Sequence, residues 1–146
     1  MRRLENKRAI VTGAGAGIGR AIALRMAKEG ARLVLADVDE ESAEQVAAEL
    51  EGGSLVHHAD VTREQEVEAL VRRAVDEWNG LDVMVNNAGV GVAATTPETS
   101  EEDYDLGMDV CVRGTLLGMK HTIPAIRESG GGSVINMSSI AALVGL

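Results

Sequence analysis

The sequence has 146 residues, enough for one domain with its own core, and 45% of them are hydrophobic although there is no Phe and only one Trp and one Tyr. Its net charge of −9 argues against a surface for nucleic acid or anionic membranes, and its single cysteine excludes an internal disulfide. The charged residues 1–8 do not resemble a signal peptide, and no apolar run reaches transmembrane length. We therefore expect a cytoplasmic protein with an aliphatic core.

Residues 8–20 predict a strand, a glycine-rich turn and a helix. The apolar run 9–11 suits a buried strand, glycines follow at positions 13, 15, 17 and 19, and helical spacing continues from 17 to about 29, before Gly30. In this order, backbone N–H groups and a helix N-terminus face an anion such as a pyrophosphate, and glycine lets the anion approach. The strict G-x-G-x-x-G string is absent, so a turn that only joins two elements stays the alternative.

The alternation of strands and helices continues to the middle of the chain. The nearly continuous apolar run 32–37 predicts a second strand, 39–50 a second helix, and 54–59 a third strand. Thr62 and Gln65 form a capping-box pattern that would open a third helix. This helix would end at Gly80 and carry one apolar stripe, made of Val67, Leu70, Val71, Ala74, Val75 and Trp78.

The second half predicts two more strands with a long helical region between them. Residues 81–85 form a fourth strand, a loop of small residues covers 91–99, and Ser100 with Asp103 starts a long helical region that runs to about 128. After three glycines, residues 133–137 form a fifth strand. Such alternation predicts an α/β fold, a Rossmann-type doubly wound parallel sheet. Because the sequence stops soon after the fifth strand, we expect a truncated sheet, the N-terminal part of something longer.

An acidic residue lies at the position that a dinucleotide-binding turn requires. Asp37 ends the second strand, 20 residues after Gly17. A carboxylate there would accept hydrogen bonds from the adenosine ribose of NAD and repel the 2′-phosphate of NADP, while Ala14 and Ala16 add no basic residue to the turn. The alternative is an ordinary carboxylate at a strand end.

Four motifs together resemble the short-chain dehydrogenase/reductase family. They are the Thr-Gly-x-x-x-Gly-Ile-Gly turn at 12–19, the pair Asp60-Val61, the Asn-Asn-Ala-Gly motif at 86–89 and the Val-Ile-Asn-Met-Ser-Ser segment at 134–139. They occur in the order of the family and cover essentially the whole chain. The resemblance implies a Rossmann domain over residues 1–146 that belongs to an NAD-dependent oxidoreductase.

The resemblance also implies roles for single residues. Gly13, Gly17, Ile18 and Gly19 would lie against the pyrophosphate of NAD. Asp37 would bind the adenosine ribose. Asp60 and Val61 would lie beside the adenine. Asn87, Ala88 and Gly89 would form the end of the fourth strand beside the cofactor. Simple loop capping stays the alternative for Asn86 and Asn87.

Ser139 is the candidate catalytic residue. The resemblance implies that its hydroxyl binds a secondary alcohol or ketone, while a tyrosine, assisted by a lysine, moves the proton during hydride transfer. The 146 residues hold no Tyr-x-x-x-Lys pair, since Tyr104 is followed by Met108 at that spacing. We therefore predict that the catalytic pair lies beyond Leu146 and that the chain is inactive alone.

Cys111 stands where the resemblance places an asparagine of the proton relay. The alternative interpretation is a small residue buried in the long helix. No histidine has partners at metal-ligand spacing, so no metal site is predicted. The region 100–128 resembles helices through which such enzymes form dimers and tetramers, which predicts a homo-oligomer. The rival to an enzyme is a non-catalytic dinucleotide-binding or oligomer-partner module.

Overall fold

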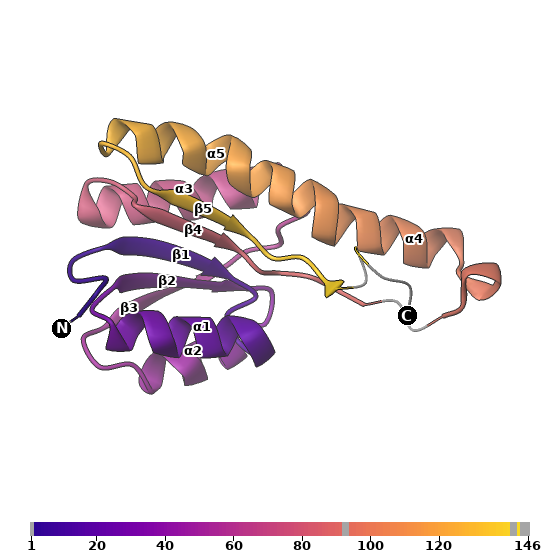
Figure 1. Cartoon of the computed structure of the whole chain (residues 1–146), viewed down its shortest axis with the longest axis horizontal. Helices are drawn as coiled ribbons and strands as arrows, with labels where there is room; N and C mark the ends of the chain where they lie inside the picture. The colour runs from indigo at the N-terminus through magenta and orange to yellow at the C-terminus, as the bar shows by residue number, and fades with distance from the viewer. Residues whose placement is uncertain (1, 92–93, 141–142, 144–146) are drawn as a thin grey trace.

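The computed structural model describes residues 2–91, 94–140 and 143, and it contains a parallel sheet of five strands with the order β3-β2-β1-β4-β5 (Figure 1). Every neighbouring pair of these strands is parallel. Their bounds are β1 (Arg8–Thr12), β2 (Arg32–Asp37), β3 (Ser54–His58), β4 (Val83–Asn86) and β5 (Ser133–Asn136). The predicted doubly wound α/β fold is confirmed.

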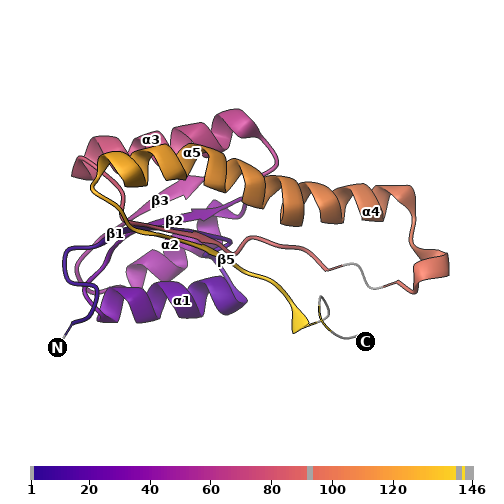
Figure 2. The same cartoon turned by 45° about the horizontal axis from the view of Figure 1, so that its top comes forward.

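Helices cover both faces of the sheet. Figure 2 shows α1 and α2 on one side and α3 and α5 on the other. The helical elements are α1 (Gly17–Lys28), α2 (Glu40–Ala48), α3 (Glu64–Trp78), the 3₁₀ turn η1 (Thr96–Glu98), α4 (Glu101–Gly107), the π-helical segment η2 (Met108–Arg113) and α5 (Gly114–Glu128). The last three run end to end as the long helical region that the sequence predicts, and α4 extends past the sheet (Figure 1).

The core has two layers because successive side chains of a strand point to opposite faces. Ala9 and Val11 of β1 belong to the cluster under α1 and α2, whereas Ile10 packs with the residues of α3 and α5. All three are fully buried. The continuous apolar runs of β1 and β2 are thus explained by a sheet that is covered on both faces.

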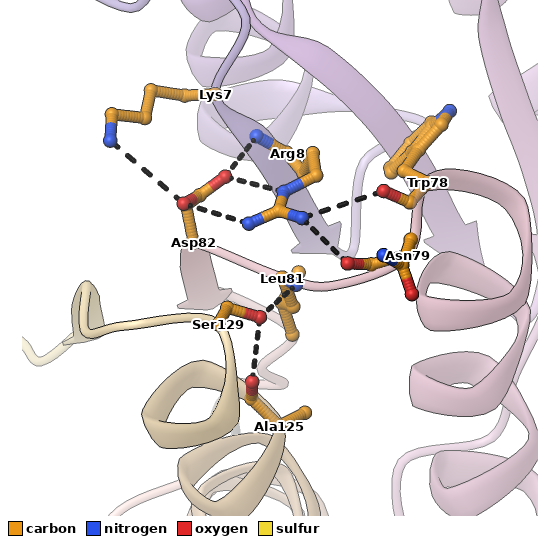
Figure 3. A network of polar contacts seen from close by, with 8 residues as sticks. All are labelled: Lys7, Arg8, Trp78, Asn79, Leu81, Asp82, Ala125 and Ser129. Atoms are coloured by element: carbon orange, nitrogen blue, oxygen red, sulfur yellow. Dashed lines mark hydrogen bonds and ion pairs between the residues drawn. The ribbon is translucent and has the colours of Figure 1, made fainter.

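A charged network closes the amino ends of β1 and β4 (Figure 3). The Arg8 Nε and backbone N–H donate to Asp82 Oδ2 over 2.7 and 2.9 Å, and Arg8 Nη2 donates to Oδ1 over 3.1 Å. Arg8 Nη1 also donates to the carbonyl oxygen of Asn79. Hydrogen bonds from the Arg8 side chain hold the pKa of Asp82 below its usual value.

The predicted capping box at Thr62 is wrong. Helix α3 begins at Glu64, one residue later than the capping box requires, and its N-cap residue Arg63 makes no side-chain cap. The hydroxyl and the N–H of Thr62 instead donate to Asp60 Oδ1, over 2.7 and 2.9 Å. The hydroxyl therefore stabilises the loop before the helix. By contrast, the predicted cap at Ser100 is confirmed, since its Oγ accepts the N–H of Asp103.

Candidate functional site

The glycine turn joins the carboxyl end of β1 to the N-terminus of α1. Gly17 has a φ of +52°, a left-handed conformation that favours glycine, and a Cβ on Gly19 would overlap the carbonyl oxygen of Gly13. Ala16 provides no side-chain cap, and the first turn of α1, all of which lies in the described part, holds no acid. The N–H groups at this helix start can therefore bind an anion.

Asp37 ties the end of β2 to the glycine turn. Its Oδ2 accepts the N–H of Gly15 over 2.8 Å, and its Oδ1 accepts the N–H of Asp39 over 3.0 Å. A Cβ at position 15 would lie 2.8 Å from the Cβ of Ser42, so α2 leaves no room there for a side chain. The Asp37 carboxylate thus stabilises the glycine turn and also forms one side of the site.

Thr12 and Asn87 join β1 to the segment after β4. The buried Thr12 Oγ1 accepts the N–H groups of Asn87 and Ala88, each over 3.0 Å. In return, Asn87 Nδ2 donates to the carbonyl oxygens of Thr12 over 2.9 Å and Gly13 over 3.2 Å. These contacts place the Asn-Asn-Ala-Gly motif beside the glycine turn.

The loop after β3 forms another side of the site. The Asp60 carboxylate accepts from Thr62, and the backbone N–H of Asp60 donates to Glu66 Oε2 over 2.8 Å. Burial raises the pKa of Asp60, but the hydrogen bonds from Thr62 outweigh this effect and leave the pKa below its usual value. Asp60 is therefore an ionised acceptor near neutral pH.

These elements enclose a pocket of about 460 Å³ at the carboxyl ends of the strands. Nine of the ten predicted cofactor-binding residues line it, namely Gly13, Gly17, Ile18, Asp37, Asp60, Val61, Asn87, Ala88 and Gly89. The tenth, Gly19, packs against Gly13 inside the turn. A second depression, of about 480 Å³, involves none of them and lies beside residues such as Arg2, Lys28 and Leu50.

Several lining residues were missed by the sequence reasoning. Ala16, Val38, Ala59 and Val90 lie next to predicted residues, so adjacency alone could have indicated them. Val110 comes from η2, and no motif marked it. Of the described residues that line the pocket, none is a lysine or an arginine, so its charges are the carboxylates of Asp37 and Asp60.

Ser139 and Cys111 lie outside the lining of this pocket. Ser139 is exposed and follows β5 by three residues. Cys111 is exposed as well, so its interpretation as a buried helix residue is wrong. It lies in η2, within the helical rod that α4, η2 and α5 form together. Its Sγ donates to the carbonyl oxygen of Val90 over 3.5 Å.

The comparison with known proteins agrees with this geometry. The sequence model of short chain dehydrogenases matches residues 7–146. The chain belongs to the short-chain dehydrogenase family. The predicted family membership is confirmed. Within the described ranges, none of the helices has the length and apolar character that a membrane crossing requires.

Curated relatives of this chain carry the description uncharacterized oxidoreductase. One from Mycobacterium bovis is 41% identical over 145 residues, which are 98% of this chain and 59% of the relative. One from Staphylococcus aureus is 37% identical over 94% of this chain and 60% of its own length. One from Thermotoga maritima is 34% identical over 97% of this chain and 57% of its own length. The chain thus spans somewhat less than two thirds of the length of these relatives.

Proposed function

We propose that this member of the short-chain dehydrogenase family belongs to an NAD-dependent oxidoreductase, with the dinucleotide in the 460 Å³ pocket. The reaction would transfer hydride between the nicotinamide and a small secondary alcohol or ketone. The observation that carries the proposal is the convergence of three motifs and Asp37 on one pocket at the carboxyl ends of parallel strands. The three motifs are the glycine turn, the Asp60-Val61 pair and the Asn-Asn-Ala-Gly motif. This edge is where open α/β sheets bind ligands.

The pyrophosphate would lie at the start of α1. Gly17 lines the pocket, and a Cβ there would meet no atom within 4 Å, so the turn is open on the pocket side. Ile18, next along the helix, is 64% exposed in spite of its apolar side chain. An uncapped helix N-terminus beside such a surface suits an anionic group joined to apolar rings.

Asp37 would make the protein prefer NAD to NADP. Its carboxylate can accept hydrogen bonds from the ribose hydroxyls and repels a 2′-phosphate. No described lining residue supplies a cation that would offset this repulsion. The exposed Val38 would lie beside the adenine, with Asp60 and Val61 along the same wall.

Ser139 would orient the substrate oxygen by a hydrogen bond from its hydroxyl. A serine hydroxyl does not supply the proton transfer, because a general acid or base needs a pKa near the working pH. A nicotinamide held in the pocket would supply or take up the hydride, and the protein would have to provide the proton transfer. The 146 residues hold no Tyr-x-x-x-Lys pair. For these residues alone we propose dinucleotide binding without turnover.

A non-catalytic binding module is the second candidate. It is favoured by the exposed Cys111, a weak hydrogen-bonding group, at the position of the expected relay asparagine. The test is an assay for the reduction of acetone and other small ketones by NADH, in a preparation of the longest natural form of this chain. Turnover would support the function as an enzyme. Saturable NADH binding without such turnover would support the module.

We also propose a homo-oligomer, a dimer or tetramer, formed through the long helical rod. Apolar side chains recur along its outer surface and are 41 to 59% exposed, namely Tyr104, Met108, Val112 and Leu116. Sedimentation of the protein and of Leu116→Lys tests this surface, because a lysine there should shift an oligomer toward monomer. The cytoplasmic location stays a prediction that rests on the single cysteine, which fits a reducing compartment.

The site is tested by mapping NADH onto the backbone amides with NMR. Titration should shift the signals of Gly17, Asp37 and Ala88, and leave those of Arg8 and Asp82 at the opposite strand ends unchanged. Shifts that gather at Lys28 and Leu50, beside the second depression, would contradict the proposed site. A matched variant, Gly17→Val, places a β-branched side chain at a left-handed position and should abolish the shifts.

A further inference from the structure

Glu66 makes a contact that the helix cap alone does not require. It is the third residue of α3, and its Oε2 accepts the backbone N–H of Asp60, six residues earlier, over 2.8 Å. In an ordinary capping box, the third residue reaches back only to the N-cap residue, which here is Arg63. The side chain of Glu66 therefore spans the whole loop between β3 and α3.

This loop is a wall of the pocket. Ala59, Asp60 and Val61 all line the pocket. On the other side of the loop, α5 approaches so closely that a Cβ on Gly114 would lie 2.7 Å from Val61 Cγ2. The wall thus contacts α5 at Val61, and α3 holds it at Asp60 through the hydrogen bond of the Asp60 N–H to the Glu66 side chain.

The Glu66 carboxylate is itself held in place. Arg63 Nη1 lies 3.7 Å from its Oε1, and His58 Nδ1 lies 3.7 Å from its Oε2. The Glu66 side chain is 29% exposed, which leaves it partly screened from water. Its hydrogen bond to Asp60 is therefore charge-assisted and fixed in geometry.

The orientation of Asp60 matters for the base that the wall contacts. Its Oδ1 accepts from Thr62, and its Oδ2 lies 3.4 Å from Arg63 Nε, so the carboxylate has a defined direction. Because Asp60 lines the pocket, its carboxylate can accept from the exocyclic amino group of a 6-aminopurine bound there. It repels a hypoxanthine ring, which has a carbonyl oxygen at the same position.

We infer that Glu66 is a positioning residue that gives the pocket its selectivity for adenine, by holding the backbone N–H of Asp60. This inference rests on the proposed dinucleotide function. Without the carboxylate, the N–H of Asp60 loses its acceptor and the wall loses its fixed position. The Asp60 carboxylate then no longer discriminates an amino group from a carbonyl oxygen.

The test compares the affinities for NADH and for reduced nicotinamide hypoxanthine dinucleotide by calorimetry. The protein should prefer NADH by about tenfold, and Glu66→Ala should reduce this ratio to about one, the change expected for one charged hydrogen bond. Glu66→Gln should keep most of the preference, because its amide oxygen still accepts from Asp60. Glu64→Ala is the matched control, since Glu64 lies in the same helical turn and pairs with His121 instead.

A general loss of stability would lower both affinities together and leave their ratio unchanged, so the ratio separates positioning from folding. In the ligand-free protein, the Asp60 amide should exchange faster in Glu66→Ala and at the normal rate in Glu66→Gln. An unchanged ratio in Glu66→Ala, or no preference in the unaltered protein, would overturn the inference and leave NADH binding intact. Absence of binding to either dinucleotide would overturn the proposed function, and this inference with it.

Discussion

The two ends of the sheet are stabilised in different ways. At the amino ends of β1 and β4, the side chains of Arg8 and Asp82 meet each other and fill the space between the strands (Figure 3). At the carboxyl ends, side chains such as Thr12 and Asp37 bind backbone N–H groups and leave a pocket between them. One end of the sheet thus contributes mainly to stability, whereas the other holds backbone in place for a ligand.

The largest expected effect on binding comes from Gly19→Ala. The added Cβ would overlap the carbonyl oxygen of Gly13, so the turn must move. We expect NADH affinity to fall by about a hundredfold or more, together with a loss of about 1–3 kcal/mol in the free energy of unfolding from overpacking. Calorimetry and urea unfolding measure both. The control is Gly91→Ala, where a Cβ would meet no atom of the described residues within 4 Å and both values should stay the same.

Asp82→Asn should have the converse effect. It removes a charge from a pair whose side chains are only 19% and 11% exposed. We expect a loss of about 2 kcal/mol in the free energy of unfolding with NADH affinity unchanged, because the pocket is at the other end. Glu77→Gln, at the exposed pair with Arg73, should cost less than about 1 kcal/mol. A large loss of NADH affinity in Asp82→Asn would contradict the separation of the two ends.

The same pair predicts a pH dependence. Arg8 lowers the pKa of Asp82 in the folded state, so the contribution of Asp82 is present above its ordinary pKa of about 4 and is lost as the pH falls through the lowered value. The free energy of unfolding should therefore fall on acidification below about pH 4, and the fall should be shallower in Asp82→Asn. Urea unfolding at a series of pH values measures this slope, and equal slopes would contradict the role of the pair.

Asp37→Ala should change selectivity more than stability. It removes the repulsion toward a 2′-phosphate and also the acceptor of the Gly15 N–H. We expect NADH affinity to fall by about tenfold, with the preference over NADPH lost. Asp39→Ala, at the cap of α2, is the control on the same loop. An unchanged preference in Asp37→Ala would count against the ribose role.

The smallest effect is expected from Ser139→Ala. Ser139 lies outside the lining of the pocket, so NADH affinity should change by less than about twofold, within the range of a surface substitution. Ketone reduction, in any longer chain that shows it, should fall sharply. A strong loss of NADH affinity would place Ser139 in dinucleotide binding instead.

The sequence predicted the fold well where the pattern was simple. β2 matches its predicted range at both ends because a strand covered on both faces reads as one apolar run. The Thr62 cap failed because a local motif does not show which group a hydroxyl will bind. No sequence motif marks Glu66, and only the folded loop brings it to Asp60.

For the site, motifs at strand ends were predictable because parallel strands bring their carboxyl ends to one edge. The places of Val110 in the pocket lining and of Cys111 outside it were not predictable, since they depend on how the helical rod extends past the sheet. Trp78 lies at the other end, where its carbonyl oxygen accepts from Arg8 over 3.4 Å. The fluorescence emission of Trp78 is thus a poor reporter of dinucleotide binding in the pocket.

The most direct test of the account is a titration of the 146-residue protein with NADH and NADPH, followed by the fluorescence of the reduced nicotinamide itself. The account predicts saturable binding that favours NADH by about tenfold or more, because the Asp37 carboxylate in the pocket would repel a 2′-phosphate. A folded protein that binds neither dinucleotide, or binds both equally, would contradict it.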